Sequence, residues 1–385
     1  MKIVHICISA PYIDGWGYQE NLLPRYLQKK GVENYVIASR NDFPSYLKPE
    51  DKAAIIAKGV DYQIDGIHVR RIKTKRLTTS LLVAKGLYEV LAEIKPDMVF
   101  HHNFNCTTLL VAGRYAKRNK IPFVVDNHAD NINMSHNKLW ALVYYRLLIG
   151  LSCKWIRRTM VRAYGVSQAR CDFMHEWYGI PKEIIRMLPI GADTDLAGHI
   201  PSKEALRDKY GCQAGDFIIV SGGKMGVGKG TDQLISAVNG LKSAYQNIRL
   251  VLFGAFEDDD TLLSAKNSDV VSVYGWCDRE KTLELLKMAD VACWPVHHTT
   301  LIEDAVSVGT PIIVRKTGNT EHLVDGNGAW VDGATTESLQ SAIQVFLSNQ
   351  DEVQRNKLQN ACEKMKNQLS YDTIAEKLLK DIYGS

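Results

Sequence analysis

Short continuous apolar runs alternate with segments of helical periodicity along the chain. The run at residues 3–9 ends before Pro11, as a buried parallel strand would. The first half further predicts strands at 35–38, 98–101, 123–126, 164–167 and 187–189, and helices at 18–30, 107–118 and 139–162. The second half predicts strands at 217–221, 250–253, 270–274, 291–294 and 311–314, then only helix over 337–385. This alternation indicates an α/β protein whose parallel sheets carry helices on both faces.

The length of the chain predicts more than one domain. Its 385 residues exceed the ~250–300 at which a single core usually stops growing. A turn rich in proline and glycine, at residues 188–193, marks a boundary. We expect a first domain over 1–190, a second over 191–368, and a helix over 369–385 that packs back on the first. Two doubly wound, Rossmann-like domains would bind a ligand in the cleft between them, at the carboxyl ends of their strands.

Composition and charge narrow the class of protein. A hydrophobic fraction of 45% and a charged fraction of 23% are ordinary for a globular chain. Eight cysteines without a CxxC pair predict reduced thiols and a cytoplasmic protein. Residues 1–190 hold 28 basic and 16 acidic residues, whereas residues 191–385 hold 19 and 27. The basic half favours an anionic partner, and without a zinc-finger or RNA-binding signature we expect no nucleic acid.

One stretch concentrates the basic charge. Residues 138–164 contain six basic residues, two tryptophans, three tyrosines and no acid. That composition fits an interfacial helix on anionic lipid, and it also fits a domain helix with one buried face. No apolar run reaches the ~18–20 residues of a membrane span, so we expect peripheral association with the inner face of the cell membrane.

A glycine-rich loop follows the first strand of the second half. Residues 217–230 have the sequence FIIVSGGKMGVGKG. Glycines let the backbone approach an anion, a helix N-terminus adds positive potential, and Lys224 and Lys229 would neutralise phosphates. The loop is not a P-loop, because no Ser or Thr stands directly after the lysine, and its glycines do not have the GxGxxG spacing. A surface loop with solvated lysines is the alternative.

A second strand-to-helix junction lies in VACWPVHHTTLIEDAVSVGTP, residues 291–311. Thr300 and Glu303 have the spacing of a capping box, in which each side chain bonds the other's backbone amide. The free N–H groups of this helix, which includes Leu301, would hold a second phosphate, and Asp304 is then left to bind hydroxyls. Alternatively, the two acids only favour the helix dipole.

In this order and spacing, the motifs resemble the group 1 (family 4) retaining glycosyltransferases of the GT-B fold. GGKMGVGKG is similar to the family's GRxxxxKG, with Lys224 in place of the usual arginine. LIEDAVSVGTPIIV is similar to LLEAMACGTPVV, and residues 166–195 are similar to VS…PNGVD. The resemblance covers most of the chain. It implies metal-independent transfer of a sugar from a nucleotide-sugar to a glycan or lipid-linked acceptor, without a cofactor, in cell-surface polysaccharide or glycolipid assembly.

The resemblance also implies roles for residues of the second half. Lys224 and Lys229 would bind the donor diphosphate. Asp304 stands five residues before Gly309, where the family has the glutamate that binds the ribose. Trp276 would lie beside the base.

In the first half, the resemblance implies two elements of the site. Gly15 and Gly17 would form a loop that faces the phosphates and the acceptor. His128, in the NHAD segment after a predicted strand, would reach the transferred sugar. From the residues alone, a histidine satisfied by a backbone carbonyl at a strand end is the alternative. His101, His102 and His136 have no recognised ligand spacing with His128, so we expect no metal site.

One departure from the family pattern bears on the donor. The family has a further acid eight residues before the second one, and Val296 stands there in this chain. His297 and His298 are the candidate substitutes, and exposed loop histidines are the alternative. Two other functions stay open: a nucleotide-sugar epimerase on a similar scaffold, against which Val296 counts because it would need carboxylates near the sugar, and an inactive glycan- or nucleotide-binding protein, which the missing acid supports.

Overall fold

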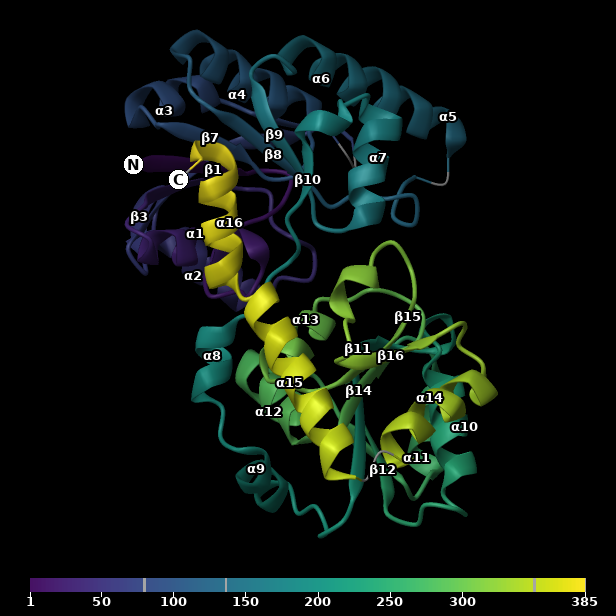
Figure 1. Cartoon of the computed structure of the whole chain (residues 1–385). Coiled ribbons are helices and arrows are strands. Elements are labelled where there is room, and N and C mark those ends of the chain that lie inside the picture. Colours follow the sequence, from purple (N-terminus) through teal and green to yellow (C-terminus); the bar gives the residue numbers. More distant parts are fainter. Residues whose placement is uncertain (79–80, 136, 349–350, 385) are drawn as a thin grey trace. The chain divides into compact units, whose positions relative to one another are not determined.

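The computed structural model describes residues 1–78, 81–135, 137–348 and 351–384, and it consists of two compact units. Unit 1 comprises Met1–Pro189 and Tyr371–Ser385, and unit 2 comprises Ile190–Ser370. The chain thus leaves unit 1 after Pro189 and returns to it at Tyr371 (Figure 1).

Unit 1 is built on an eight-stranded sheet of order β10-β9-β8-β7-β1-β2-β4-β3. All neighbours are parallel except β3 and β4, and β5 pairs with β6 in a separate antiparallel ribbon. The strand order reverses between β1 and β7. The switch point, at which sheets of this kind bind ligands, therefore lies between the carboxyl ends of these two strands. The strands are β1 (Lys2–Cys7), β2 (Glu33–Ser39), β3 (Asp61–Ile64), β4 (Ile67–Ile72), β5 (Thr74–Arg76), β6 (Leu82–Ala84), β7 (Met98–His101), β8 (Phe123–Asn127), β9 (Met160–Gly165) and β10 (Ile185–Met187).

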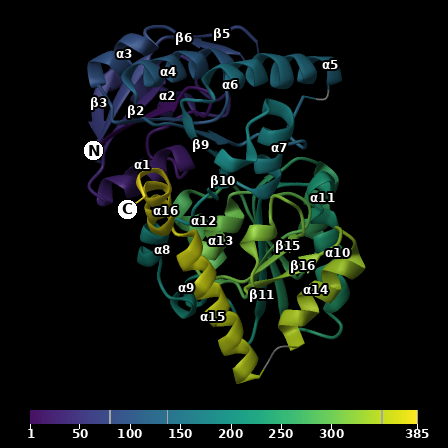
Figure 2. The same ribbon diagram turned by 45° about the horizontal axis from the view of Figure 1, so that its top comes forward.

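Helices cover both faces of this sheet. The apolar side chains of α16 join the buried cluster under α1, and Lys30 holds Asp372 of α16 at 2.8 Å. Figures 1 and 2 both show α16 running beside α1. The helices of unit 1 are α1 (Gln19–Lys29), α2 (Pro49–Ala57), α3 (Leu87–Ile94), α4 (Cys106–Asn119), α5 (Lys138–Ala141), α6 (Gly150–Ile156), α7 (Gln168–Tyr178) and α16 (Tyr371–Tyr383).

A π-helical segment, Leu142–Ile149, joins α5 and α6 into one helix over Lys138–Ile156. Tyr144, Ile149 and Cys153 bury one face of this helix in the core of unit 1. The 19-residue helix is long and apolar enough to cross a membrane by length and composition, with a mean hydropathy of 1.2. The expectation that no segment reaches this length was therefore wrong, because Arg146 and Lys154 interrupt the apolar run without making the helix polar on average.

Unit 2 has a six-stranded, fully parallel sheet of order β13-β12-β11-β14-β15-β16. Its strands are β11 (Phe217–Met225), β12 (Ile248–Phe256), β13 (Val271–Tyr274), β14 (Val291–Trp294), β15 (Ile312–Arg315) and β16 (Gly328–Val331). Its helices are α8 (Thr194–His199), α9 (Lys203–Lys209), α10 (Thr231–Leu241), α11 (Asp259–Asn267), α12 (Arg279–Met288), α13 (Leu301–Ser307), α14 (Thr336–Ser348) and α15 (Glu352–Leu369). This is the Rossmann strand order, with its switch point between β11 and β14.

The structure confirms the predicted fold class of two Rossmann-like α/β units. Several elements differ from the prediction. The helix expected over residues 139–162 ends at Ile156, and β9 starts at Met160. The β3–β4 hairpin and β16 were not predicted.

Candidate functional site

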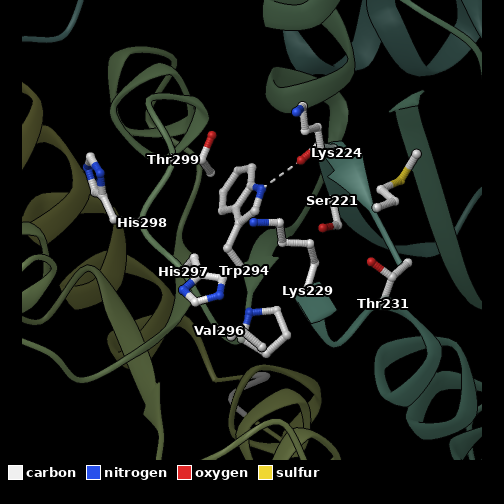
Figure 3. Close-up of a pocket in the computed structure, with 12 residues that line it drawn as sticks. Ser221, Lys224, Lys229, Thr231, Trp294, Val296, His297, His298 and Thr299 are labelled. Atoms are coloured by element: carbon white, nitrogen blue, oxygen red, sulfur yellow. Dashed lines mark hydrogen bonds between the residues drawn. The ribbon is translucent and has the colours of Figure 1, made fainter. Parts of the chain in front are cut away.

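A cavity of about 210 Å³ opens in unit 2 where β11 and β14 end. It therefore lies at the switch point of this sheet. Its lining is Ser221, Gly222, Lys224, Met225, Lys229, Thr231, Trp294, Pro295, Val296, His297, His298 and Thr299. Figure 3 shows these side chains, with the hydrogen bond of 3.1 Å that the Trp294 indole donates to the Gly222 carbonyl. Among the described residues that line it, two are lysines, two are histidines and none is acidic.

Two glycines of the predicted loop are required by close packing. A Cβ on Gly222 would lie 2.3 Å from the Phe253 ring. Gly230 has a φ of +71°, and a Cβ there would lie 2.8 Å from Ala334. Glycine alone fits this backbone, which brings the loop against β14 and sets both lysines around one cavity.

The two lysines differ in exposure. Lys224, near the end of β11, keeps 77% of its side chain exposed, and its Nζ lies 3.9 Å from Glu257. Lys229 ends a single 3₁₀ turn after β11 and is partly buried. Because neither amine is fixed in a buried ion pair, both can reach an anion in the cavity.

The two predicted histidines lie in different surroundings. His297 is exposed, and partial burial together with Lys229 and Arg315 lowers its pKa. His298 is 8% exposed, and its Nε2 lies 2.8 Å from Oε1 of Glu303. In Figure 3 the ring of His298 points away from Lys229.

The predicted capping box at Thr300 does not form. Thr300 has helical dihedral angles and makes no side-chain capping bond. The backbone carbonyl of Thr299 accepts a hydrogen bond from the N–H of Ile302 at the start of α13. Glu303 is 1% exposed, and it bonds His298 rather than the amide of Thr300. The buried histidine competes for the carboxylate, because burial makes an ion pair or hydrogen bond there more valuable than a solvated cap.

Asp304 lies beside Glu303 but pairs elsewhere. Its Oδ2 accepts a hydrogen bond of 2.8 Å from Arg279, on α12. Burial raises the pKa of Asp304 to about 6, even though Arg279 acts against that shift. Arg279 was not predicted as a site residue, and its only signal in the sequence is a basic residue three positions after Trp276.

Three other predicted residues of unit 2 stand outside the cavity lining. Leu301 begins α13 and packs near Gly223, whose Cβ would lie 3.2 Å from it. Trp276 follows β13 and is 73% exposed. Thr300 is exposed.

The remaining predicted residues belong to unit 1, where they follow the carboxyl ends of strands β1 and β8. Gly15, with a φ of +79°, and Gly17 lie in the loop after β1. His128 follows β8, and its side chain is 25% exposed. Its Nε2 lies 3.7 Å from Asp126 and 3.9 Å from Glu20.

Buried polar residues behind His128 were not predicted to belong to the site. His5, His102 and Asp126 are each 0% exposed. His101 is satisfied by the Asn103 carbonyl and the Thr108 hydroxyl, and burial lowers its pKa to about 4. His136 lies outside the described residues. The signal available in the sequence was an aspartate inside an apolar strand, in the segment VVDN.

Two Rossmann-like units, with a cavity at the switch point of the second, form the fold of the GT-B class of glycosyltransferases. The chain matches the Glycosyltransferase Family 4 profile over residues 22–196 and the Glycosyl transferases group 1 profile over residues 202–366. The chain therefore belongs to the group 1 (family 4) glycosyltransferases, as its motifs predicted.

A curated relative is the D-inositol 3-phosphate glycosyltransferase of Xylanimonas cellulosilytica, 25% identical over 225 residues. The alignment covers 54% of this chain and 52% of that protein, so the chain spans about half the length of this relative.

Solved structures with the same fold include a glycosyltransferase from Rickettsia africae, with a TM-score of 0.72, 15% identity, and coverage of 99% of this chain and 98% of that one. HepE from Anabaena, in complex with UDP and glucose, has a TM-score of 0.67 and 16% identity, with all of both chains covered. An enzyme described as a putative UDP-N-acetylglucosamine 2-epimerase from Listeria monocytogenes has a TM-score of 0.58 and 15% identity, with 99% and 95% covered. At these identities the likeness shows the fold alone.

Proposed function

We propose that this glycosyltransferase moves a sugar, with retention of configuration and without a metal ion, from a nucleotide-sugar to a glycan or lipid-linked acceptor in cell-surface polysaccharide or glycolipid assembly. The observation that carries the proposal is the cavity of unit 2, which combines two lysines with a lining free of acids among its described residues. Such a cavity suits a diphosphate. The UDP bound by the fold relative HepE supports a nucleotide-sugar donor.

The donor site of the proposal uses residues of unit 2. Lys224 and Lys229 neutralise the diphosphate at the mouth of the cavity. Asp304 binds the ribose through Oδ1, since Arg279 occupies its Oδ2. Trp276 offers an exposed ring for the base, and His297 contacts the donor sugar where Val296 replaces the expected acid.

The chemistry breaks the bond between the anomeric carbon and the diphosphate oxygen. Negative charge grows on the leaving diphosphate, and Lys224 and Lys229 stabilise it there. The acceptor hydroxyl attacks the same face of the sugar and gives its proton to the departing phosphate oxygen. The proposal assigns His128 to a hydroxyl of the transferred sugar.

The acceptor side of the proposal involves an anionic membrane surface at the cytoplasmic face. The helix Lys138–Ile156 turns apolar side chains outward, among them Leu139 at 72%, Leu151 at 60% and Trp155 at 53% exposed. Exposed Arg157 and Arg158 follow it. Shallow apolar insertion and basic contacts of about 1 kcal/mol each suit peripheral binding. The buried face of the helix argues against a span, because spanning would remove Ile149 and Cys153 from the core.

The test of activity is a panel of radiolabelled nucleotide-sugars, assayed in single turnover with lipid-linked and soluble acceptors in the presence of EDTA. We expect transfer to one acceptor class, with the anomeric configuration of the donor kept. Strict dependence on Mn²⁺ or Mg²⁺, or an inverted product, would contradict the mechanism.

The membrane part has its own test, by co-sedimentation with vesicles. Anionic phosphatidylglycerol vesicles should bind the protein, neutral phosphatidylcholine vesicles should bind little, and salt should release it. Leu151→Asp should weaken binding, whereas Val353→Asp, at a 78% exposed site of unit 2, should not. Equal binding to neutral vesicles would contradict the proposal.

The same panel separates the two alternatives. A nucleotide-sugar epimerase would return an epimerised donor without any acceptor, and its candidacy rests on the fold shared with the Listeria protein. An inactive binding protein would shift the thermal stability with nucleotides and turn over nothing.

A further inference from the structure

A chain of hydrogen bonds runs through the interior of unit 1 behind His128. Nε2 of His5 lies 3.1 Å from Oδ1 of Asn34, and Nδ1 of His5 lies 2.9 Å from Nε2 of His102. Nδ1 of His102 then lies 2.7 Å from Oδ2 of Asp126. All four side chains belong to residues that are at most 1% exposed.

The direction of the first two bonds follows from Asn34. Its Nδ2 donates to the carbonyls of Pro24 and Val32, each at 3.0 Å, so Oδ1 is the atom that faces His5. His5 must therefore donate from Nε2. Burial, with help from His102, lowers the pKa of His5 to about 3, so this ring is neutral at pH 7. Its Nδ1 then accepts, and Nε2 of His102 donates.

The last bond ends on a carboxylate. Oδ1 of Asp126 accepts the backbone N–H of Asn103 at 2.6 Å, and Oδ2 also lies 3.5 Å from Nε2 of Gln19. Burial works to raise the pKa of Asp126, but His102 and His128 outweigh it and lower the pKa. Nδ1 of His102 therefore faces a carboxylate oxygen, and Nε2 of the same ring faces the accepting Nδ1 of His5, so both nitrogens are placed to donate. His102 and Asp126 form a buried histidine–carboxylate pair in which Nδ1 of His102 donates to Oδ2 of Asp126.

We propose that the His102–Asp126 pair positions His128, holding its Nε2 inward and leaving Nδ1 as the nitrogen that meets the substrate. Nε2 of His128 is buried and faces two carboxylates, at 3.7 Å in Asp126 and 3.9 Å in Glu20. The exposed quarter of the side chain lies away from that atom. This positioning role rests on the proposed function, in which His128 contacts the transferred sugar.

The charges around His128 decide what Nδ1 offers. Burial lowers the pKa of His128, but Asp126 and Glu20 raise it more, while Arg170 on α7 opposes them. Arg170 is itself held by Asp130 and donates to the backbone carbonyl of His128. The ring of His128 therefore keeps its second proton to a higher pH than an ordinary histidine does. In that form Nδ1 donates a hydrogen bond instead of accepting one.

Nitrogen NMR of the wild-type protein, labelled with ¹⁵N-histidine, tests the pair without any turnover. At pH 7.5 we expect His102 to show two protonated nitrogens and His5 to show a proton on Nε2 alone. Addition of UDP-glucose, as a probe donor, should move the Nδ1 signal of His128 more than its Nε2 signal. A neutral His102 ring, or a larger shift at Nε2, would overturn the proposal.

Kinetics of two matched variants complete the test. Asp126→Asn keeps the size of the side chain and should lower kcat about 10–100-fold, by analogy with the loss of an outer partner of a metal-binding histidine. It should leave KM for the donor near the wild-type value and shift the pH profile to lower pH. His101→Gln changes the adjacent buried histidine, whose ring bonds the Asn103 carbonyl and the Thr108 hydroxyl and none of the groups in this hydrogen-bond chain, and it should keep kcat.

The outcomes separate the two proposals. Wild-type kcat in a folded Asp126→Asn variant would overturn the positioning role. A wild-type protein that transfers no sugar would refute the proposed function, and the NMR spectra would still decide whether the pair exists as described. If Asp126→Asn does not fold, those spectra decide alone.

Discussion

Two buried histidine–carboxylate pairs differ in how completely they are satisfied. In unit 1, His102 and Asp126 are 2.7 Å apart, and both ring nitrogens of His102 and both carboxylate oxygens of Asp126 have protein partners. In unit 2, His298 and Glu303 are 2.8 Å apart, but Oε2 of Glu303 is buried with no partner among the described residues. A complete pair is a fixed part of the structure. An incomplete pair keeps a buried oxygen, at a cost of about 1–3 kcal/mol, that a ligand can satisfy.

The largest effect should come from breaking the complete pair. Asp126→Ala leaves the Nδ1 donor of His102 buried without its carboxylate, so the free energy of unfolding should fall by about 3–5 kcal/mol. Urea denaturation at pH 7 measures it. A loss below about 1 kcal/mol would show that His102 gives up its proton easily and that the pair is not ionic.

Cavity residues should show the opposite behaviour. Lys224→Ala and Lys229→Ala should each cost roughly 2–4 kcal/mol of transition-state stabilisation, measured as kcat/KM for the donor, because each removes a charge from the leaving diphosphate. Stability should stay within ~0.5 kcal/mol, since both amines are near the surface. Full activity in both variants would place the diphosphate elsewhere.

The neighbour of the incomplete pair should respond to pH. Burial gives Asp304 a pKa of about 6, against about 3.9 in an unfolded chain. Between these values the native state binds more protons, so this carboxyl makes stability fall as pH rises from about 4 to 6. Relative to Asp304→Asn, the wild-type protein should lose about 1–3 kcal/mol between pH 4.5 and pH 7 in urea unfolding. Parallel stability curves for the two proteins would disprove this assignment.

The smallest effect should come from replacing the carboxylate of the second pair by an amide. Glu303→Gln replaces a buried charge by an amide, so stability without ligand should stay equal or rise, while affinity for UDP should fall about 10-fold. Calorimetry measures the affinity and thermal unfolding the stability. Unchanged affinity would mean that Oε2 of Glu303 meets no part of the nucleotide.

The sequence predicted the elements whose patterns are local. The apolar runs that became β1, β8, β11 and β14 are buried on both faces. β11 continues past the predicted residue 221 to Met225, so Lys224 lies on the strand and Lys229 in the turn after it. Strands with less apolar character were missed. β3 alternates exposed and half-buried residues, and β16 is short and contains a glycine.

Only those site residues could be predicted whose roles follow from neighbours a few positions away in the sequence. The spacing of Thr300 and Glu303 fits a capping box, but a histidine five residues before Glu303 takes its carboxylate instead. The pairing of Asp126 with His102 joins residues 24 apart in the sequence, one on β8 and one directly after the neighbouring β7, which no local pattern reports. The helix predicted to residue 162 shows the same limit, since β9 is fixed by its pairing with β8.

The return of the chain to unit 1 at Tyr371 has a consequence for biosynthesis. The buried faces of Tyr371, Ile374 and Leu378 complete a core that Leu23 and Tyr26 begin. On the ribosome, that core stays open while the intervening 181 residues of unit 2, Ile190–Ser370, are translated. Unit 2 is a continuous segment and can fold as it emerges, whereas unit 1 starts earlier and closes later. A nascent chain stalled before residue 371 would therefore expose apolar surface to chaperones and proteases.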